Sequence, residues 1–232
     1  MEFFKRKKAC NAFTLAEVLI VIAVIGVIAA LSVPILVNST NNKTYVDGML
    51  RAYSILKTAT GEIMTDNGGT MIQAGSSNAN IRDQFCTILN CIETCNSSVD
   101  DNCIENAVTL HGGSPGFDFN QEGAILDNGM SLVFNAFFSA DARNCILDGH
   151  VISGQNVCCG EIMVDINGSN APNKIGRDVF SFQIYNQGIV PDGAVGTSSE
   201  DWSERCDTGS TNSFNGEGCA GKIIAEGNRI SY

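Results

Sequence analysis

Three oxygen-bearing side chains fall close together between two apolar segments: Asp165, Asn167 and Asp178. Carboxylate and carboxamide oxygens on an irregular loop are the ligands that calcium prefers. The spacing is not that of an EF-hand, because Gly168 falls at the fourth position of the segment and that motif requires its glycine at the sixth. The segment is therefore predicted to be a loop held by Asx turns, with a calcium site at these three residues as the alternative.

Cysteines are the second group of residues that could do chemistry, and the chain has 10 of them. So many thiols suit an oxidising compartment, where they become cross-links, better than a reducing cytosol. Cys10 precedes a long apolar run, and the other nine are disulfide candidates: Cys86, Cys91, Cys95, Cys103, Cys145, Cys158, Cys159, Cys206 and Cys219. Because nine is odd, at least one thiol is expected to be free or bonded to another chain.

The cysteines from Cys86 to Cys103 are dense, with four in 18 residues, and this density favours local disulfides. Zinc is the alternative for this group. However, Cys91 and Cys95 are spaced slightly too widely for a zinc knuckle, and no second close pair follows them. The adjacent residues Cys158 and Cys159 are expected in two separate bridges, because a bond between neighbours is strained.

Groups for catalysis are scarce in this sequence. The two histidines, His111 and His150, have neither a metal-ligand spacing nor a recognisable nucleophile motif beside them. The 25 acidic residues outnumber the 14 basic ones, and acidic pairs such as Asp100-Asp101 are typical of solvated loops. The sequence therefore predicts a protein that is not an enzyme.

The charges are divided by position along the chain. Residues 5–8 form a basic cluster, whereas the whole chain has a formal net charge of −11. Removal of residues 1–12 would take away four positive charges and one negative charge and leave −14. A body this acidic repels nucleic acid phosphates, so no direct nucleic acid partner is expected.

The elements that must position these residues begin with a 25-residue apolar run, Phe13–Val37, which carries a single charge at Glu17. A helix rises about 1.5 Å per residue and crosses a bilayer core of roughly 30 Å in about 20 residues, so this run can span a membrane. The basic cluster before it should stay in the cytoplasm, which places everything after Val37 on the outer side.

Glu17 is the informative residue of this run, because a carboxylate inside an apolar helix is unfavourable and is usually retained for a partner. No cation lies elsewhere in the apolar segment. The partner should therefore come from another molecule or from a new N-terminus nearby. A cut between Ala12 and Phe13 would create such an amine and make Glu17 the fifth residue of the mature chain.

The segment KKACNA followed by FTLAEVLIVIAVIGVIAALSVP resembles the prepilin cleavage and methylation signal of type IV pilins and type II secretion pseudopilins. The matching features are a short basic leader, a small residue before the cut, an apolar stretch and the residues Ala12, Phe13, Thr14, Leu15, Glu17 and Pro34. The family usually has glycine where this chain has Ala12, which is also small.

The resemblance implies that a prepilin peptidase and N-methyltransferase cuts before Phe13 and methylates the new amine. It also implies that Glu17 pairs with the N-terminus of a neighbouring subunit and that Pro34 bends the helix. The expected partners are other pilin or pseudopilin subunits and the assembly platform of the bacterial inner membrane. Two simpler interpretations are a signal peptide cut after Ser32 and an ordinary uncleaved anchor.

Beyond the membrane run, apolar residues recur at steps of three or four and predict an amphipathic helix that packs on its own domain: Tyr45, Met49, Tyr53, Leu56, Ala59 and Ile63. The polar run Asn38–Lys43 and Pro34 predict bends or local melting along it. Further on, Ala124–Leu126 and Met130–Phe134 predict a hairpin around Asn128-Gly129. Ile162–Ile166 and Val179–Tyr185 are further strand candidates, the second with one buried face.

The predicted organisation is a basic leader at 1–12, a membrane and assembly helix at 13–37, an amphipathic continuation at 38–66 and an extracytoplasmic β-rich domain at 67–232. The fold class is α+β: a long N-terminal helix packed on a mainly antiparallel sheet with disulfide-rich loops, as in pilins. The expected function is that of a filament subunit. The alternatives are a membrane-anchored adhesin or ligand-binding module, and a secreted enzyme released after Ser32.

Overall fold

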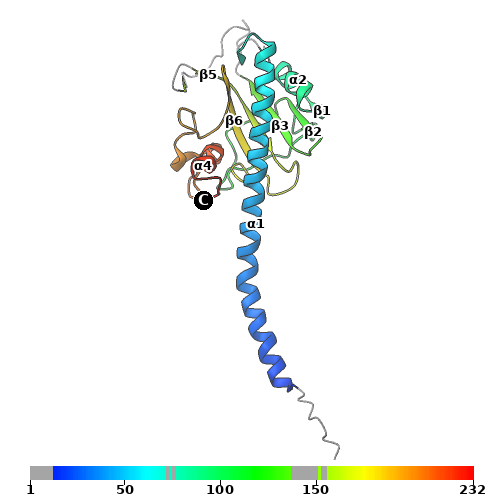
Figure 1. Cartoon of the computed structure of the whole chain (residues 1–232), viewed down its shortest axis with the longest axis vertical. Coiled ribbons are helices and arrows are strands. Elements are labelled where there is room, and N and C mark those ends of the chain that lie inside the picture. The colour runs from blue at the N-terminus through cyan, green and yellow to red at the C-terminus, as the bar shows by residue number, and fades with distance from the viewer. Residues whose placement is uncertain (1–12, 72–73, 75–76, 137–150, 153–155) are drawn as a thin grey trace, which may run out of the picture. The chain divides into compact units, whose positions relative to one another are not determined.

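The computed structural model describes residues 13–71, 74, 77–136, 151–152 and 156–232 (Figure 1). Its first element is α1, Leu15–Asp66. The helix runs through 38–43 without a break, so the local melting predicted for this polar segment does not occur. The chain divides into two compact units, and the boundary falls within α1 between Asn41 and Asn42.

In the first unit, the segment Leu15–Val33 is long and apolar enough to cross a membrane, judged by length and composition. Its mean hydropathy is 2.7 over 19 residues, and none of it is buried. Even Val18, the least exposed of its large apolar side chains, is 49% exposed. The apolar surface of this segment is therefore left uncovered by the described part of the chain.

In the second unit, the remainder of α1 presents a buried stripe to a β-sheet, as the three- and four-residue spacing predicts. Met49, Leu56 and Ala59 are 0% exposed, while Tyr45 and Tyr53 pack against the same core at its edge. The stripe joins the strands in one apolar cluster, and this part of α1 lies across the sheet (Figure 1). The helix thus supports the domain rather than a partner.

The sheet is antiparallel, with its main strands in the order β1-β2-β3-β5-β6-β7 and the short β4 paired with β5. The strands are β1 (Cys91–Cys95), β2 (Gly123–Leu126), β3 (Ser131–Ala136), β4 (Val151–Ile152), β5 (Asn156–Asp165), β6 (Val179–Tyr185) and β7 (Gly188–Pro191). The helices after α1 are α2 (Asn78–Ile88), α3 (Trp202–Arg205) and α4 (Cys219–Ala225). The α+β fold expected from the sequence is confirmed.

The predicted hairpin is present as β2 and β3, in which Ala124 pairs with Leu132. Gly129 adopts φ +84°, which glycine reaches without strain and which the tight turn between the strands requires. The prediction of a buried face on β6 is confirmed but incomplete, because all seven of its residues are buried. Its even-numbered residues face α1, whereas a second apolar cluster and a polar network cover the other face.

Three disulfides link described cysteines, and all of them are local in sequence: Cys86–Cys91, Cys95–Cys103 and Cys206–Cys219. The first two use all four thiols of the dense group, which leaves none of them for zinc. Cys159 is also disulfide-bonded, whereas its neighbour Cys158 is free and buried, so these two do not both form bridges as expected. Cys145 lies outside the described residues.

Candidate functional site

The start of α1 carries the residues that the sequence singles out for processing and assembly. Phe13 is 86% exposed. The Thr14 backbone N–H and hydroxyl both donate to Glu17 Oε2 at 2.8 Å, and the Glu17 N–H donates to Thr14 Oγ1 at 3.2 Å. This reciprocal pair is a capping box, which satisfies backbone donors at a helix N-terminus.

The capping box gives Glu17 a local role that the sequence interpretation did not include. The carboxylate nevertheless remains exposed on the helix, so an amine from a second chain can reach it. Ala12, on the other side of the expected cut, lies outside the described residues. The backbone at Pro34 is helical within α1, and the side chain at this position is not among those described.

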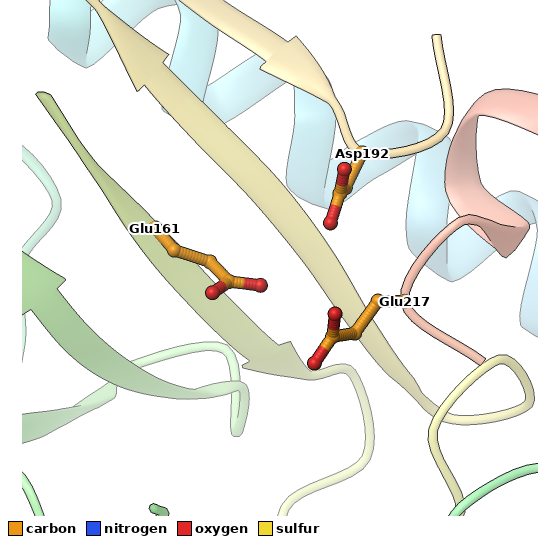
Figure 2. A group of neighbouring side chains, drawn as sticks. All are labelled: Glu161, Asp192 and Glu217. Carbon is orange, nitrogen blue, oxygen red and sulfur yellow. The ribbon is translucent and has the colours of Figure 1, made fainter. Parts of the chain in front are cut away.

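A cluster of three carboxylates lies in the globular domain, on Glu161, Asp192 and Glu217 (Figure 2). Glu161 projects from β5, Asp192 directly follows β7, and Glu217 lies just before α4. The carboxylates point toward one another, with one oxygen from each within 4.8 Å of the others. Asp192 and Glu217 are 1% and 5% exposed.

Hydrogen bonds from β6 and the C-terminal segment satisfy this cluster, with Asp192 at its centre. Asp192 accepts from Ser181 Oγ at 3.2 Å, Gln183 Nε2 at 2.8 Å and Ser199 Oγ at 3.0 Å. Ser181 also bonds to Glu161. Buried carboxylates need such donors, because an unpaired one loses its hydration without replacement.

One cation compensates the cluster among the described residues. Arg205 Nη1 lies 3.4 Å from Glu217 Oε2, and the guanidinium also stacks 4.6 Å from the ring centroid of Phe214. Burial and, to a smaller extent, the neighbouring charge of Asp192 raise the pKa of Glu161 to about 8. Burial likewise raises the pKa of Asp192 and Glu217, while Arg205 lowers both.

The three carboxylates are close enough to hold a metal ion, and protonation is the other way to neutralise them. Each already has hydrogen-bond donors or the Arg205 guanidinium, and burial keeps their pKa values high. The arrangement can therefore be neutralised by protonation, without a metal ion.

The three residues predicted as calcium ligands come together around the connection between β5 and β6. Asp165 ends β5 and Asp178 precedes β6, and both are 0% exposed. The Ile166 N–H donates to the Asp178 carbonyl at 2.9 Å and closes the loop at its base. Burial raises the pKa of Asp178, although backbone N–H groups of the loop and the Asn167 side-chain amide lower it.

Asp165 and Asp178 are close enough to affect each other's ionisation. Burial and, to a smaller extent, the charge of Asp178 raise the pKa of Asp165 to about 8. The expected Asx turn is present, because Asp165 Oδ1 accepts from the Asn167 N–H at 3.1 Å. The loop thus contains the turn that the sequence predicts and also brings the predicted oxygen ligands together.

The remaining reactive side chains of the described chain do not form a catalytic arrangement that we recognise. His111 Nδ1 lies 2.9 Å from the Thr208 carbonyl on the surface, and His150 lies outside the described residues. Burial raises the pKa of the free Cys158 thiol to about 12, so it stays protonated and unreactive.

The comparison with known families identifies the N-terminal segment. Residues 7–33 match the family described as the prokaryotic N-terminal methylation motif, which is the prepilin-type signal of type IV pilins and pseudopilins. The motif implies processing by a prepilin peptidase. Together with the apolar helix, it indicates a membrane-anchored, single-pass protein.

The match therefore assigns the chain a pilin-type or pseudopilin-type signal, and the domain after it has a pilin-like α+β fold. Proteins with this signal are structural subunits rather than enzymes. No curated protein and no solved structure matches the chain.

The sequence interpretation missed the acidic cluster, because its members are far apart and share no motif spacing. Glu161 faces Gln183 across the β5–β6 pair, and the backbone of Asp192 pairs with that of Ser181. A signal did exist: Ser181 and Gln183 are polar residues at alternate positions of an otherwise apolar strand. Such a pattern indicates a buried polar face that needs partners.

Proposed function

We propose that this protein is a structural subunit, a pilin or pseudopilin, of a type IV pilus-like or type II secretion filament. A prepilin peptidase cuts between Ala12 and Phe13 and methylates the new amine. The helix over 13–37 holds the subunit in the inner membrane, and the domain over 67–232 lies on the extracytoplasmic side. An assembly platform then stacks subunits through their N-terminal helices.

The observation that carries this proposal is the methylation motif at residues 7–33, which includes the uncovered apolar segment Leu15–Val33. An apolar helix that its own chain leaves bare must be buried elsewhere. A bilayer can bury it before assembly, and neighbouring copies of the same helix can bury it in a filament. Both environments are those of a pilin-type subunit.

The globular domain supports the same proposal in a second way. Its core is formed by the sheet and the later part of α1, so the domain does not need the apolar segment Leu15–Val33 for its own packing. Its local disulfides suit an oxidising compartment outside the cytosol. A folded head on a separate apolar helix is the arrangement that helix stacking requires.

The first experiment measures the intact mass and the N-terminal peptide mass of the mature protein from cells that contain a prepilin peptidase. We expect a chain that starts at Phe13 and carries one methyl group on its amine. A start at Met1 would contradict processing, and a start at Val33 would indicate an ordinary signal peptide.

The second experiment separates the two roles of Glu17. Glu17→Gln removes the charge but keeps a side chain that can complete a capping box, whereas Thr14→Ala removes the box and keeps the charge. We expect Glu17→Gln to be processed normally but to lower filament yield at least about tenfold, a loss of roughly 1.4 kcal/mol in assembly. Thr14→Ala should assemble nearly as well as the wild type.

The same pair of variants tests the rival function of an anchored adhesin. An adhesin would reach the cell surface and bind equally well with either variant, because a single anchored copy needs no intersubunit charge pair. Equal filament yield from Glu17→Gln and wild type would contradict the proposed role of the charge.

A further inference from the structure

Buried side-chain oxygens without hydrogen-bond partners gather at one loop of the domain. Among the described residues, such atoms are Oδ2 of Asp165, Oδ1 of Asn167 and Oδ1 of Asn173, and the structure has no others. All three belong to the connection between β5 and β6 or to the end of β5. Buried oxygens nearly always have a hydrogen-bond partner. Three unpaired oxygens in one loop therefore point to a bound ligand.

The two carboxylates beside these acceptor oxygens favour a cation over a neutral donor such as water. Asp165 and Asp178 are both 0% exposed, and they repel each other electrostatically. Neither forms a salt bridge, since the pairs found in the described chain are Arg82–Asp83 and Arg205–Glu217. Two buried carboxylates in one site with no cation partner are unfavourable when both are ionised.

The nearest guanidinium in sequence is already occupied elsewhere. Arg177 donates from Nη1 to Asn42 Oδ1 and from Nη2 to the Tyr232 carbonyl, each at 3.0 Å. It also stacks on the Tyr232 ring, 5.4 Å from the centroid. These contacts hold the Arg177 guanidinium against α1 and the C-terminal residue. In the described chain, it forms no salt bridge with Asp165 or Asp178.

Backbone hydrogen bonds hold the candidate ligands in place. Asp178 Oδ2 accepts from the Asn173 N–H at 2.9 Å, and Oδ1 accepts from the Lys174 N–H at 2.7 Å. The Asn167 N–H fixes Asp165 Oδ1 at 3.1 Å, which leaves Oδ2 available. Each carboxylate oxygen has a second lone pair, so these bonds orient the groups without exhausting them.

We propose that Asp165, Asn167, Asn173 and Asp178 bind a calcium ion. The set consists of carboxylate and carboxamide oxygens on an irregular loop, which suits a hard cation with flexible geometry. Magnesium demands near-ideal octahedral geometry, and zinc prefers nitrogen and sulfur ligands. Calcium takes about six to eight oxygens, so water molecules complete its shell.

Asn173 is a ligand that the sequence pattern alone did not single out. Its side-chain oxygen is one of the three orphans, and its backbone N–H binds Asp178. Its own carbonyl accepts from the Val108 N–H at 3.0 Å, which ties the loop to a distant segment. An ion at this place would therefore connect the loop, both strand ends and the segment at Val108.

The ion would also stabilise the contact between the loop and α1 in the second unit. Ile166 packs closely on Gly48, where an added Cβ would lie 2.5 Å from Ile166 Cδ1. Arg177, at the end of the same loop, holds Asn42. Calcium binding should consequently stabilise the domain where α1 enters it, independently of whether the chain is processed or assembled.

The test uses the full chain in detergent micelles, freed of metal with EGTA, and measures the unfolding temperature during titration with calcium chloride. At free calcium about 100 times the dissociation constant, the unfolding temperature should rise by roughly 5 to 10 °C. Isothermal titration calorimetry on the same sample gives the stoichiometry, which should be one ion per chain.

Two matched variants locate the site. Asp165→Asn should lose the response to calcium while its unfolding temperature in EGTA stays equal to or above that of the wild type, because it removes a buried charge. Asn173→Ala should weaken calcium binding at least about tenfold. Glu161→Gln alters the separate acidic cluster and should keep the full response.

Three outcomes would overturn the proposal. One is no response of the wild type up to about 10 mM calcium, which exceeds the range of weak extracellular calcium modules. The second is a full rise in unfolding temperature with calcium in Asp165→Asn, or a loss of that rise in Glu161→Gln. Either result would place the ion elsewhere. The third is an equal response to magnesium chloride at the same concentration, which would remove the assignment to calcium.

Discussion

The domain holds two buried acidic clusters that differ in how their oxygens are satisfied. At Glu161, Asp192 and Glu217, hydroxyl and amide donors and the Arg205 guanidinium surround the carboxylates. At Asp165 and Asp178, backbone N–H groups bind some oxygens, and three oxygens of the loop remain unpaired. The first cluster has partners within the described chain, whereas the second is the proposed site of a cation.

The difference teaches that burial and charge alone do not mark a binding site. Both clusters contain buried carboxylates with raised pKa values, and the three carboxylates of the first lie close to one another. The two clusters differ in the hydrogen-bond donors that surround their carboxylates. Side-chain donors and the Arg205 guanidinium satisfy the first cluster. Backbone N–H groups bind the carboxylates of the second, and three side-chain oxygens there have no partner.

The largest expected effect comes from removing the cation of the first cluster. Arg205→Met keeps the apolar stem but leaves Glu217 without its salt bridge, so the domain should lose roughly 3 kcal/mol of stability near pH 8. Urea unfolding measures the loss. Arg229→Met, at an exposed position, is the control and should change little. A loss that calcium reverses would contradict the separation of the two clusters.

The next largest effect is the pH dependence of the first cluster. Glu161 has a raised pKa in the folded state, so its stabilising contribution is complete below about pH 4.5 and is lost as the pH rises through about 8. Glu161→Gln imitates the protonated form. It should match the wild type near pH 4.5 and exceed it in unfolding temperature by roughly 5 °C near pH 8.5.

Thermal unfolding in EGTA across this pH range measures the difference between the two proteins, so titration of the other carboxylates cancels. Parallel curves for the variant and the wild type would show that Glu161 ionises normally in the folded protein. A variant that is less stable at high pH would reverse the predicted sign.

The smallest expected effect concerns one donor of the first cluster. Ser199 is 0% exposed and donates to Asp192 Oδ2 at 3.0 Å, so Ser199→Ala should destabilise the domain by about 1 to 2 kcal/mol. Denaturant unfolding measures this, with Ser114→Ala at an exposed position as the control. An unchanged stability of Ser199→Ala would show that a water molecule replaces the hydroxyl and that water reaches the cluster.

Local patterns predicted the features that depend on neighbouring residues. Asn128-Gly129 placed the β2–β3 hairpin, because its backbone preference is set within the turn itself. The spacing from Tyr45 to Ile63 gave the buried face of α1, and the apolar run after Phe13 gave the segment that can span a membrane. Each of these features needs only one stretch of chain.

Features that depend on tertiary contacts could not be read from the sequence. The second buried face of β6 exists because distant segments cover it, and alternation within the strand does not reveal them. The acidic cluster needs the register of β5 against β6. Asn173 resembles any loop asparagine until its oxygen is found to be buried without a partner. Asp165 and Asp178 stood out in the sequence because they flank the two strand candidates.

The Cys206–Cys219 disulfide has a consequence for the order in which the protein matures. Cys206 directly follows Arg205, and Cys219 stands two residues after Glu217, so the bond fixes both partners of the salt bridge at one place. In a reduced chain, the covalent constraint on this cation and carboxylate is absent. The charge balance inside the domain is therefore linked to the redox state of the compartment where it folds.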